Sequence, residues 1–503
     1  MIRIAHISDT HITSDAAYKG YAFDLIAEEI NRGDFDFVIH TGDVTNQGLR
    51  EEYERASYEL KKIRKPIVVL PGNHDVRNVG YKLFEKFIGP PNGVFEFQEG
   101  VLIWVDSTIP DLSDGRIGEY KFRWLRGKLE EYSSRRIKIV AAHHHLIPLP
   151  DTGRERNVLY NAGDVLDLFL RHEVTLYTCG HKHVPNLYRV EDLVVDNAGC
   201  TSCRKTRAGD VNSYNVITLY DDGRMEVRIR RVTGDEFRKE HRAVKPKLFI
   251  PKGKRLVRVV QMSESNVSDR VYFRKKVLEH AIRMINEKLK PDLVIHNGDL
   301  VDAGIERYYA KAYEFYERIK ARKLIVPGHN DITYLGHDLF KEYFGRPNTV
   351  EIGKFAFIPV QSAQYETPIG VVGRMGQRIL RDLLREHDDK FTTVVMHHNI
   401  IPVPRSREIG FLEDAGDVLK MITEENANLV LTGHGGNAFG VKVEDSPIVN
   451  AGSVSWELHR NPYGNTFNVI DIYTHIVVAF EVQATWGSGR LLGIWKVKKN
   501  LNP

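Results

Sequence analysis

The feature of this sequence that most constrains its fold is an internal repeat, because the second half of the chain follows the first motif by motif. The segment FDFVIHTGDV at 35–44 returns as PDLVIHNGDL at 291–300, and VLPGNHD at 69–75 returns as IVPGHND at 325–331. Further matches pair His143–Pro148 with His397–Pro402, Ala162–Leu166 with Ala415–Leu419, and Asn197–Gly199 with Asn450–Gly452. A period this long indicates duplication of a whole domain. The sequence therefore predicts two domains, 1–245 and 246–503.

Within each copy, strand patterns alternate with helix patterns. Apolar residues fall on one helical face in 124–132, and Leu380, Leu383 and Leu384 do the same in the second copy. Residues 214–220 and 224–229 flank the turn Asp221-Asp222-Gly223, which is typical of an antiparallel hairpin. This mixture predicts an α/β fold with mixed sheets. The basic, proline-containing stretch 238–255 between the copies is interpreted as a solvated tether, with contact to phosphates as the alternative.

Composition narrows the class of protein without naming a partner. Hydrophobic residues make up 42% and charged residues 27% of the 503, which is typical of a globular protein. A net charge of +4 is too small to argue for nucleic acid or a membrane surface. The N-terminal residues run straight into a predicted strand, so we expect no signal peptide and a cytoplasmic location. Three cysteines cannot form a disulfide framework, and the pair Cys200 and Cys203 is expected to lie in an ordinary loop, with a redox-active pair as the alternative.

Polar side chains follow a series of apolar runs in the first copy. Asp43 ends the run VIHTGD, and strand ends of this kind are where open α/β sheets place their ligands. The other groups are Asp9 and His11, Asn73 to Asp75, His143 to His145, and His181 with His183. Asp9 and His11 are separated by one residue, as are His181 and His183. On an extended chain such a pair points to the same face, which suits chelation of a metal ion. Carboxylate, amide and imidazole ligands favour manganese, iron, zinc or nickel over calcium.

With these motifs the first half resembles the calcineurin-like metallophosphoesterase superfamily, whose pattern Asp-x-His, Gly-Asp, Gly-Asn-His-Asp/Glu, His, Gly-His-x-His is met in full. The resemblance implies a four-layer α/β/β/α sandwich with mixed sheets, in two tandem copies. It also implies two divalent transition-metal ions bridged by Asp43. Asp9, His11 and His183 would hold one ion, and Asn73, His143 and His181 the other. His143 is chosen as the first histidine after its strand, and His144 is the alternative.

The resemblance further implies hydrolysis of a phosphate ester by a water held between the two ions. His74 would stabilise or protonate the leaving oxygen, and Asp75 is expected to orient the His74 ring. His6 and His40 match none of the family's ligand positions, and we expect them to be buried, hydrogen-bonded side chains and not metal ligands. Arg154 and Arg156 are equally suited to clamping a phosphate and to being solvated.

The expected substrate is a small phosphodiester. Residues 44–48, VTNQG, with Asn161-Ala162-Gly163-Asp164, are similar to the cyclic-nucleotide and glycerophosphodiester phosphodiesterase branch, and the arginine that protein phosphatases carry after Gly-Asp is missing. A nuclease, a phosphomonoesterase and a non-catalytic metal-binding scaffold stay open as alternatives. Nucleic acid is possible but not favoured as a partner, and no membrane is expected.

The second copy is predicted to be degenerate and catalytically inactive. Glu264, Asn266 and Gly436 stand at the positions of Asp9, His11 and His183. Asp299, His397 and His434 are kept, while the order His329-Asn330 inverts Asn73-His74. A mononuclear site involving His329 is the alternative. We expect the two copies to pack as an internal pseudo-dimer.

Overall fold

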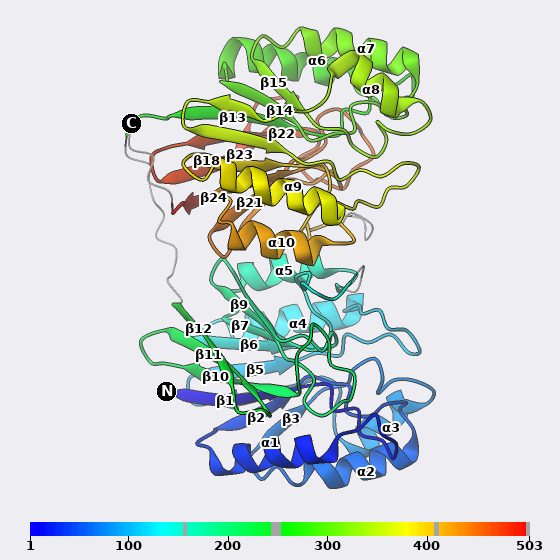
Figure 1. The fold of residues 1–503 in the computed structure, drawn as a ribbon, viewed down its shortest axis with the longest axis vertical. Helices are drawn as coiled ribbons and strands as arrows, with labels where there is room; N and C mark the ends of the chain where they lie inside the picture. The colour runs from blue at the N-terminus through cyan, green and yellow to red at the C-terminus, as the bar shows by residue number, and fades with distance from the viewer. Residues whose placement is uncertain (154–157, 243–252, 407–411, 499–503) are drawn as a thin grey trace. The chain divides into compact units, whose positions relative to one another are not determined.

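The computed structural model describes residues 1–153, 158–242, 253–406 and 412–498 (Figure 1). The chain divides into two compact units, Met1–Pro246 and Lys247–Pro503.

The first unit alternates strands and helices before it ends in a run of strands. Its elements are β1 (Ile2–Ile7), α1 (Gly20–Arg32), β2 (Phe37–His40), α2 (Arg50–Leu60), β3 (Ile67–Val69), α3 (Gly80–Phe87), β4 (Gly93–Phe97), β5 (Gly100–Trp104), α4 (Glu119–Glu131), β6 (Ile137–Ala141), α5 (Ala162–Arg171), β7 (Leu176–Cys179), β8 (Asn186–Val190), β9 (Leu193–Asn197), β10 (Ser213–Leu219), β11 (Arg224–Arg231) and β12 (Glu236–Arg242). The predicted helix at 124–132 is confirmed as α4, and the predicted hairpin is confirmed as β10 and β11, which pair antiparallel.

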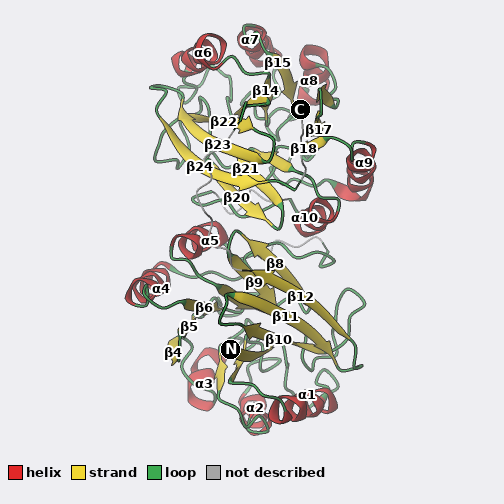
Figure 2. Cartoon of the chain, turned by 90° about the vertical axis from the view of Figure 1, so that its left-hand side faces the viewer, coloured by secondary structure: helices red, strands yellow, loops and turns green. Residues whose placement is uncertain are grey.

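Two mixed sheets form the centre of this unit. One has the strand order β12-β11-β10-β1-β2-β3 and the other contains β8-β9-β7-β6-β5-β4. Strand alternation divides the apolar residues between two cores. Phe37 and Ile39 pack between the sheets with Ile139, whereas Val38 packs outward against Phe23 of α1 and Tyr53 of α2. Helices α1 to α3 therefore cover the first sheet, and α4 and α5 lie outside the second (Figure 2).

The basic stretch between the copies does not begin where the sequence suggested. Residues up to Arg242 form strand β12, which pairs antiparallel with β11, so the prediction of a tether from residue 238 is wrong for this part. Charged side chains are paired along this edge, for example Arg238 with Glu226 and Arg228 with Glu236. Such pairs suit an exposed edge strand, since charge discourages pairing with further chains. Residues 243–252 of the stretch lie outside the described residues.

The second unit repeats this plan. Its elements are β13 (Val257–Met262), α6 (Lys275–Met284), the π-helix Ile285–Leu289, β14 (Leu293–His296), α7 (Glu306–Glu317), β15 (Arg322–Ile325), α8 (Gly336–Phe344), β16 (Val350–Ile352), β17 (Phe355–Pro359), α9 (Gly373–Glu386), β18 (Phe391–Val395), α10 (Ala415–Glu424), β19 (Leu429–Thr432), β20 (Phe439–Val443), β21 (Ser446–Asn450), β22 (Thr466–Ile472), β23 (Ile476–Gln483) and β24 (Gly489–Lys496). Its sheets contain β15-β14-β13-β22-β23-β24 and β16-β17-β18-β19-β21-β20. The expected fold, an α/β/β/α sandwich with mixed sheets in two tandem copies, is confirmed. Among the described residues, no helix is both long and apolar enough to cross a membrane.

Two glycine turns approach each other at the strand ends of the first sheet. A Cβ on Gly72 would lie 2.2 Å from the backbone nitrogen of Asp43, and a Cβ on Gly42, whose φ is +97°, would lie 2.6 Å from the backbone nitrogen of Gly72. Neither contact leaves room for a side chain, so this approach requires glycine on both turns.

We expect Gly72→Ala to destabilise the protein by about 1–3 kcal/mol, because the added methyl group forces the two turns apart. Gly127→Ala is the matched control, since a Cβ there meets nothing within 4 Å and the residue lies inside α4. The control should be neutral or stabilising by about 0.5–1 kcal/mol, because alanine favours helix. Urea unfolding of both variants measures the difference, and equal midpoints would contradict the steric argument.

Candidate metal centre

The candidate side chains come from loops that directly follow parallel strands. Asp9 follows β1, Asp43 follows β2 and Asn73 follows β3 in the first sheet. His143 follows β6 and His181 follows β7 in the second sheet. Because β1, β2 and β3 are parallel to one another, as are β6 and β7, their carboxyl ends deliver these residues to one edge of the sandwich.

Backbone hydrogen bonds fix the loops that carry Asp9 and Asp43. The amide of Asp9 donates to the carbonyl of Gly42 at 3.0 Å, and the amide of His11 donates to the carbonyl of Asp43 at 2.9 Å. Three of the residues named here also have φ values in the left-handed region: Asp9 at 54°, His11 at 47° and Asp43 at 53°. His181 and His183 share this conformation, at 77° and 58°. Such backbone costs about 1–3 kcal/mol per residue and is concentrated at functional sites.

Asp75 holds the backbone of these turns and not the ring of His74. Its carboxylate accepts hydrogen bonds from the amides of Val44 at 3.0 Å, Thr45 at 2.8 Å and Gly72 at 2.8 Å. Burial, followed by the neighbouring Asp43 charge, raises the pKa of Asp75 to about 7. The expectation that Asp75 orients His74 is wrong, because the side chain lies behind the turn and satisfies its amides.

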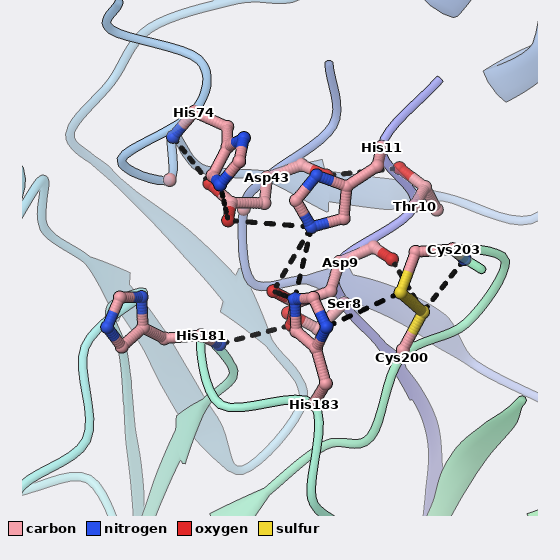
Figure 3. Close-up of polar contacts among 12 residues, drawn as sticks. Ser8, Asp9, Thr10, His11, Asp43, His74, His181, His183, Cys200 and Cys203 are labelled. Carbon is pink, nitrogen blue, oxygen red and sulfur yellow. Dashed lines mark hydrogen bonds and ion pairs between the residues drawn. A yellow bond between two sulfur atoms is a disulfide. The ribbon is translucent and has the colours of Figure 1, made fainter. Parts of the chain in front are cut away.

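The first group of converging ligand atoms belongs to Asp9, His11, Asp43 and His183 (Figure 3). His183 Nε2 lies 3.2 Å from Asp9 Oδ1 and 3.1 Å from His11 Nε2. His11 Nε2 lies 3.7 Å from Asp43 Oδ2. Because His183 Nδ1 donates to the carbonyl of Lys205 at 2.5 Å, the neutral ring turns an unprotonated Nε2 toward the carboxylate.

The second group belongs to Asp43, His143 and His181, together with the amide oxygen of Asn73. His143 Nε2 lies 3.4 Å from Asp43 Oδ2 and 3.1 Å from Asn73 Oδ1. His181 Nδ1 lies 2.9 Å from Asn73 Oδ1. His143 Nδ1 donates to the carbonyl of Thr41 at 2.7 Å, which leaves Nε2 for the cluster.

His144 is placed differently from His143. Its Nδ1 contacts the hydroxyl of Ser107 at 2.8 Å, and its Nε2 contacts the carbonyl of Ser113 at 3.2 Å. Both ring nitrogens are therefore engaged away from Asp43, and burial lowers the pKa of His144 to about 3. The geometry favours His143 over His144 as the ligand from this run of histidines.

These two groups fit a pair of cations. Lone pairs of carboxylate, amide and imidazole face one another at about 3 Å, and Asp9 Oδ1 is buried without a hydrogen-bond donor. Buried acceptors that face each other are unfavourable unless a proton or a metal ion lies between them. Asp43 belongs to both groups, so its carboxylate would be a ligand of both ions. Nitrogen and oxygen donors of this kind suit divalent manganese, iron, zinc or nickel.

Without metal ions, a proton on His143 supplies positive charge next to the Asp43 carboxylate. Burial alone would lower the pKa of His143, but the adjacent Asp43 carboxylate outweighs it and raises the pKa to about 9. The pKa of Asp43 stays well below its usual range, because although burial raises it, His143 and His74 lower it further. Burial lowers the pKa of His11 to about 3.

His74 lies at the edge of the first group. Its Nδ1 donates to the carbonyl of Asn46 at 2.7 Å, and its Nε2 lies 4.0 Å from Asp43 Oδ2. Arg77 Nη2 is 3.1 Å from the same Nε2. The ring is therefore held with one nitrogen facing the centre, next to a guanidinium that sequence reasoning did not single out.

His6 and His40 are confirmed as buried, hydrogen-bonded side chains. His6 contacts Asp196 at 2.6 Å and Thr41 at 2.9 Å. His40 contacts the hydroxyl of Thr10 at 3.0 Å and accepts from the amide of Gly42 at 3.2 Å. Both rings brace the ligand-bearing loops from behind.

A cavity of about 810 Å³ opens over the centre. His11, Asp43, Asn73, His74, His181 and His183 line it. The basic residues in its wall are Arg77, Lys182, Arg204, Lys205 and Arg207. This wall suits an anionic ligand, and a volume of this size suits a small molecule. Sequence reasoning missed the three basic residues at 204–207, although they follow the Cys-x-x-Cys motif directly. Arg154 and Arg156 lie outside the described residues.

The Cys-x-x-Cys pair is not an ordinary loop. Cys200 and Cys203 are joined by a disulfide, which corrects the expectation from the sequence. Cys203 Sγ lies 3.4 Å from His183 Nδ1, and Cys200 Sγ lies 3.3 Å from the carbonyl of Asp9 (Figure 3). The pair packs behind the ligands of the first group, a contact between segments about 190 residues apart that no local pattern announces.

Comparison with known proteins agrees with this geometry. The profile of the calcineurin-like phosphoesterase family matches residues 2–185 and 267–435, more than half of the chain. The chain belongs to the calcineurin-like phosphoesterase family. It is accordingly a hydrolase of phosphoric esters.

Relatives of this phosphoesterase include two groups of bacterial enzymes. The 3',5'-cyclic adenosine monophosphate phosphodiesterase CpdA of Escherichia coli (strain K12) is 27% identical over 192 residues, which covers 36% of this chain and 70% of the relative. The glycerophosphodiester phosphodiesterase GpdQ of Enterobacter lignolyticus is 27% identical over 197 residues, with the same coverage of 36% and 70%. A dimetal phosphatase from Danio rerio aligns with a TM-score of 0.38 and 14% identity, over 47% of this chain and 98% of that one.

We expect binding of Mn²⁺ or Zn²⁺ to this phosphoesterase to release at least one proton per chain at about pH 8. His143 has a pKa of about 9 in the metal-free chain, above its unfolded value of 6.5, so its proton stabilises the metal-free fold fully below about pH 6.5 and this contribution is lost as pH rises through 9. Metal affinity should therefore increase with pH up to about 9.

Calorimetric titration in two buffers of different ionisation enthalpy measures this release. The His143→Gln variant serves as the control, because it lacks the imidazole that titrates at position 143. Identical heats in both buffers for the unaltered protein would contradict the prediction.

Proposed function

We propose that the first unit hydrolyses a small phosphodiester of the cyclic-nucleotide or glycerophosphodiester kind at a dinuclear metal centre. The observation that carries this proposal is the convergence of two groups of potential metal-ligand atoms that share the carboxylate of Asp43. Relatives named as cyclic nucleotide and glycerophosphodiester phosphodiesterases support a diester as the substrate.

The proposal gives each ligand a role. Asp9, His11, Asp43 and His183 would hold one ion, and Asp43, Asn73, His143 and His181 would hold the other. When bound, two such ions supply Lewis acidity toward phosphoryl oxygens and lower the pKa of water toward about 7, so that hydroxide is available at neutral pH. The hydrogen bonds of His143 to Thr41 and of His183 to Lys205 hold each ring with Nε2 turned inward.

We propose that His74, as an imidazolium, donates its Nε2 proton to the leaving oxygen and becomes the neutral ring. Its Nδ1 is tied to the carbonyl of Asn46, which aims Nε2 at the cavity over Asp43. Charge that develops on the leaving oxygen favours a donor at that nitrogen. Arg77, now 3.1 Å from Nε2, is placed to pair with a substrate phosphate and thereby leave the ring free to donate.

The basic wall of the cavity is proposed to bind the rest of the substrate. Arg77, Arg204 and Lys205 line the cavity. A diester carries one negative charge, and a guanidinium pairs with two phosphate oxygens at once.

The cytoplasmic location and the internal pseudo-dimer stay predictions. The nuclease and the non-catalytic scaffold stay alternative functions, and activity assays separate them from a phosphodiesterase.

We expect the manganese-loaded protein to hydrolyse bis-p-nitrophenyl phosphate faster than p-nitrophenyl phosphate. Asp43→Asn should reduce this turnover to background, because it removes the charge that both ions share. A panel of cyclic mononucleotides, cyclic dinucleotides, glycerophosphodiesters and single-stranded DNA then identifies the substrate class. Faster monoester turnover would contradict the diesterase proposal, and no turnover with manganese, zinc, nickel or iron would favour a scaffold.

His74→Ala should retain its metal ions and lose about 10²–10⁴-fold in turnover of a diester with an alcohol leaving group. The loss should be much smaller with bis-p-nitrophenyl phosphate, because nitrophenolate leaves without a proton. Steady-state rates on both substrates, with metal content measured on the same samples, test the role. A variant that loses metal, or equal losses on both substrates, would show that His74 is not the proton donor.

A further inference from the structure

The second unit keeps one half of the centre with an altered set of ligands. His397 Nε2 lies 3.2 Å from His329 Nδ1 and 3.1 Å from His434 Nδ1. Asp299 Oδ2 lies 3.3 Å from His329 Nδ1, and Asp299 Oδ1 lies 3.7 Å from His397 Nε2. This arrangement matches Asp43, Asn73, His143 and His181 of the first unit, with the imidazole of His329 in place of the amide of Asn73.

The ring nitrogens of the second unit are oriented by the same device. His397 Nδ1 donates to the carbonyl of Asn297 at 2.6 Å, which leaves Nε2 to face His329 and His434. His398 also lies near this cluster, but its Nδ1 contacts Ser362 at 3.0 Å and its Nε2 contacts the carbonyl of Pro368 at 3.1 Å. It is therefore the structural counterpart of His144 and not a ligand.

The positions that correspond to Asp9, His11 and His183 carry different residues in this unit, and these residues form hydrogen bonds within the protein. The carboxylate of Glu264, at the position of Asp9, accepts a hydrogen bond at 3.0 Å from the amide of Gly436, at the position of His183. Asn266 replaces His11, and its amide oxygen accepts from Asn330 Nδ2 at 3.0 Å. Side-chain amides and a glycine offer no imidazole here, so the residues present do not fit a second ion.

The backbone of the retained half is held as it is in the first unit. Asp299 has a φ of 56°, close to the 53° of Asp43, and His434 has a φ of 58°, in the left-handed region where its counterpart His181 also lies, at 77°. A Cβ on Gly328 would lie 2.1 Å from Asp299 Oδ1, as one on Gly72 would from Asp43. Asp299 also accepts from the backbone amide of Asn330 at 3.0 Å and from Asn330 Nδ2 at 3.2 Å. A carboxylate has about four lone-pair sites, so these two bonds leave room for an ion.

We propose that the second unit binds a single zinc-class divalent ion through His329, His397, His434 and Asp299. Three imidazoles and one carboxylate supply four ligands of the kinds that zinc binds, which is the number that a tetrahedral zinc site needs. The site does not hydrolyse esters, because its four positions are filled by protein and Asn330 stands where His74 stands. It holds together the loops after β14, β15, β18 and β19, which supply these ligands.

The test compares metal content in the full-length protein. Zinc-loaded protein is dialysed against metal-free buffer, and zinc per chain is measured by mass spectrometry for the unaltered chain, for His329→Ala and for His337→Ala. His337 is the control because it is an exposed histidine of the same unit, with 60% of its side chain accessible. We expect His329→Ala to lose about one equivalent relative to both others. The difference is read without any activity, so this proposal and the proposed function fail separately.

A second variant, His329→Asn, tests the proposal in case His329→Ala does not fold. His329→Asn carries the residue that the first unit has at this position, so the turn accommodates it. We expect it to fold and to release its zinc to a chelator at a lower chelator concentration than the unaltered chain does, because an amide is a weaker zinc ligand than an imidazole. Equal zinc content in the unaltered chain and His329→Ala, or equal release from the unaltered chain and His329→Asn, would overturn the proposal.

Discussion

The close approach of two glycine turns at the ends of β2 and β3 is the constraint on which the rest of the first unit depends. Gly42 and Gly72 pass each other with no room for a side chain. Behind them, the Asp75 carboxylate accepts from the amides of Gly72, Val44 and Thr45. This contact places Asp43 at the edge of one sheet, facing the histidines of the other. Without it, the ligands of the two sheets would not share a carboxylate.

The centre concentrates unfavourable features that an ion offsets. Ligand residues are held in left-handed backbone, and buried acceptors face one another at distances suited to a cation. In the metal-free chain this imbalance appears as a high pKa for His143, which takes up a proton to balance Asp43. The left-handed backbone and the buried acceptor atoms are therefore unfavourable for the metal-free fold, and a bound cation would offset their cost.

The two units show that the frame and its chemistry vary independently. Gly298 and Gly328 approach as closely as Gly42 and Gly72, and His296 contacts Ser265 much as His40 contacts Thr10. With these turns unchanged, the two units differ in a few side chains that supply the candidate ligand atoms. Where Gly436 replaces His183, the backbone keeps a positive φ, at 69°, but the ligand is gone.

The sequence by itself determined the duplication, the α/β alternation and the loops that carry the ligands, because apolar runs ending in Gly-Asp or Asp-x-His are local patterns. Only the tertiary structure shows how the surroundings of His143 and His144 differ, since the carbonyl of Thr41, which accepts from His143 Nδ1 and turns Nε2 inward, lies 102 residues away. The same holds for Asp75, for the disulfide of Cys200 and Cys203, and for the position of Arg77 beside His74. Each of these depends on where a distant backbone carbonyl, amide or side chain comes to lie, which the spacing of residues along the chain does not specify.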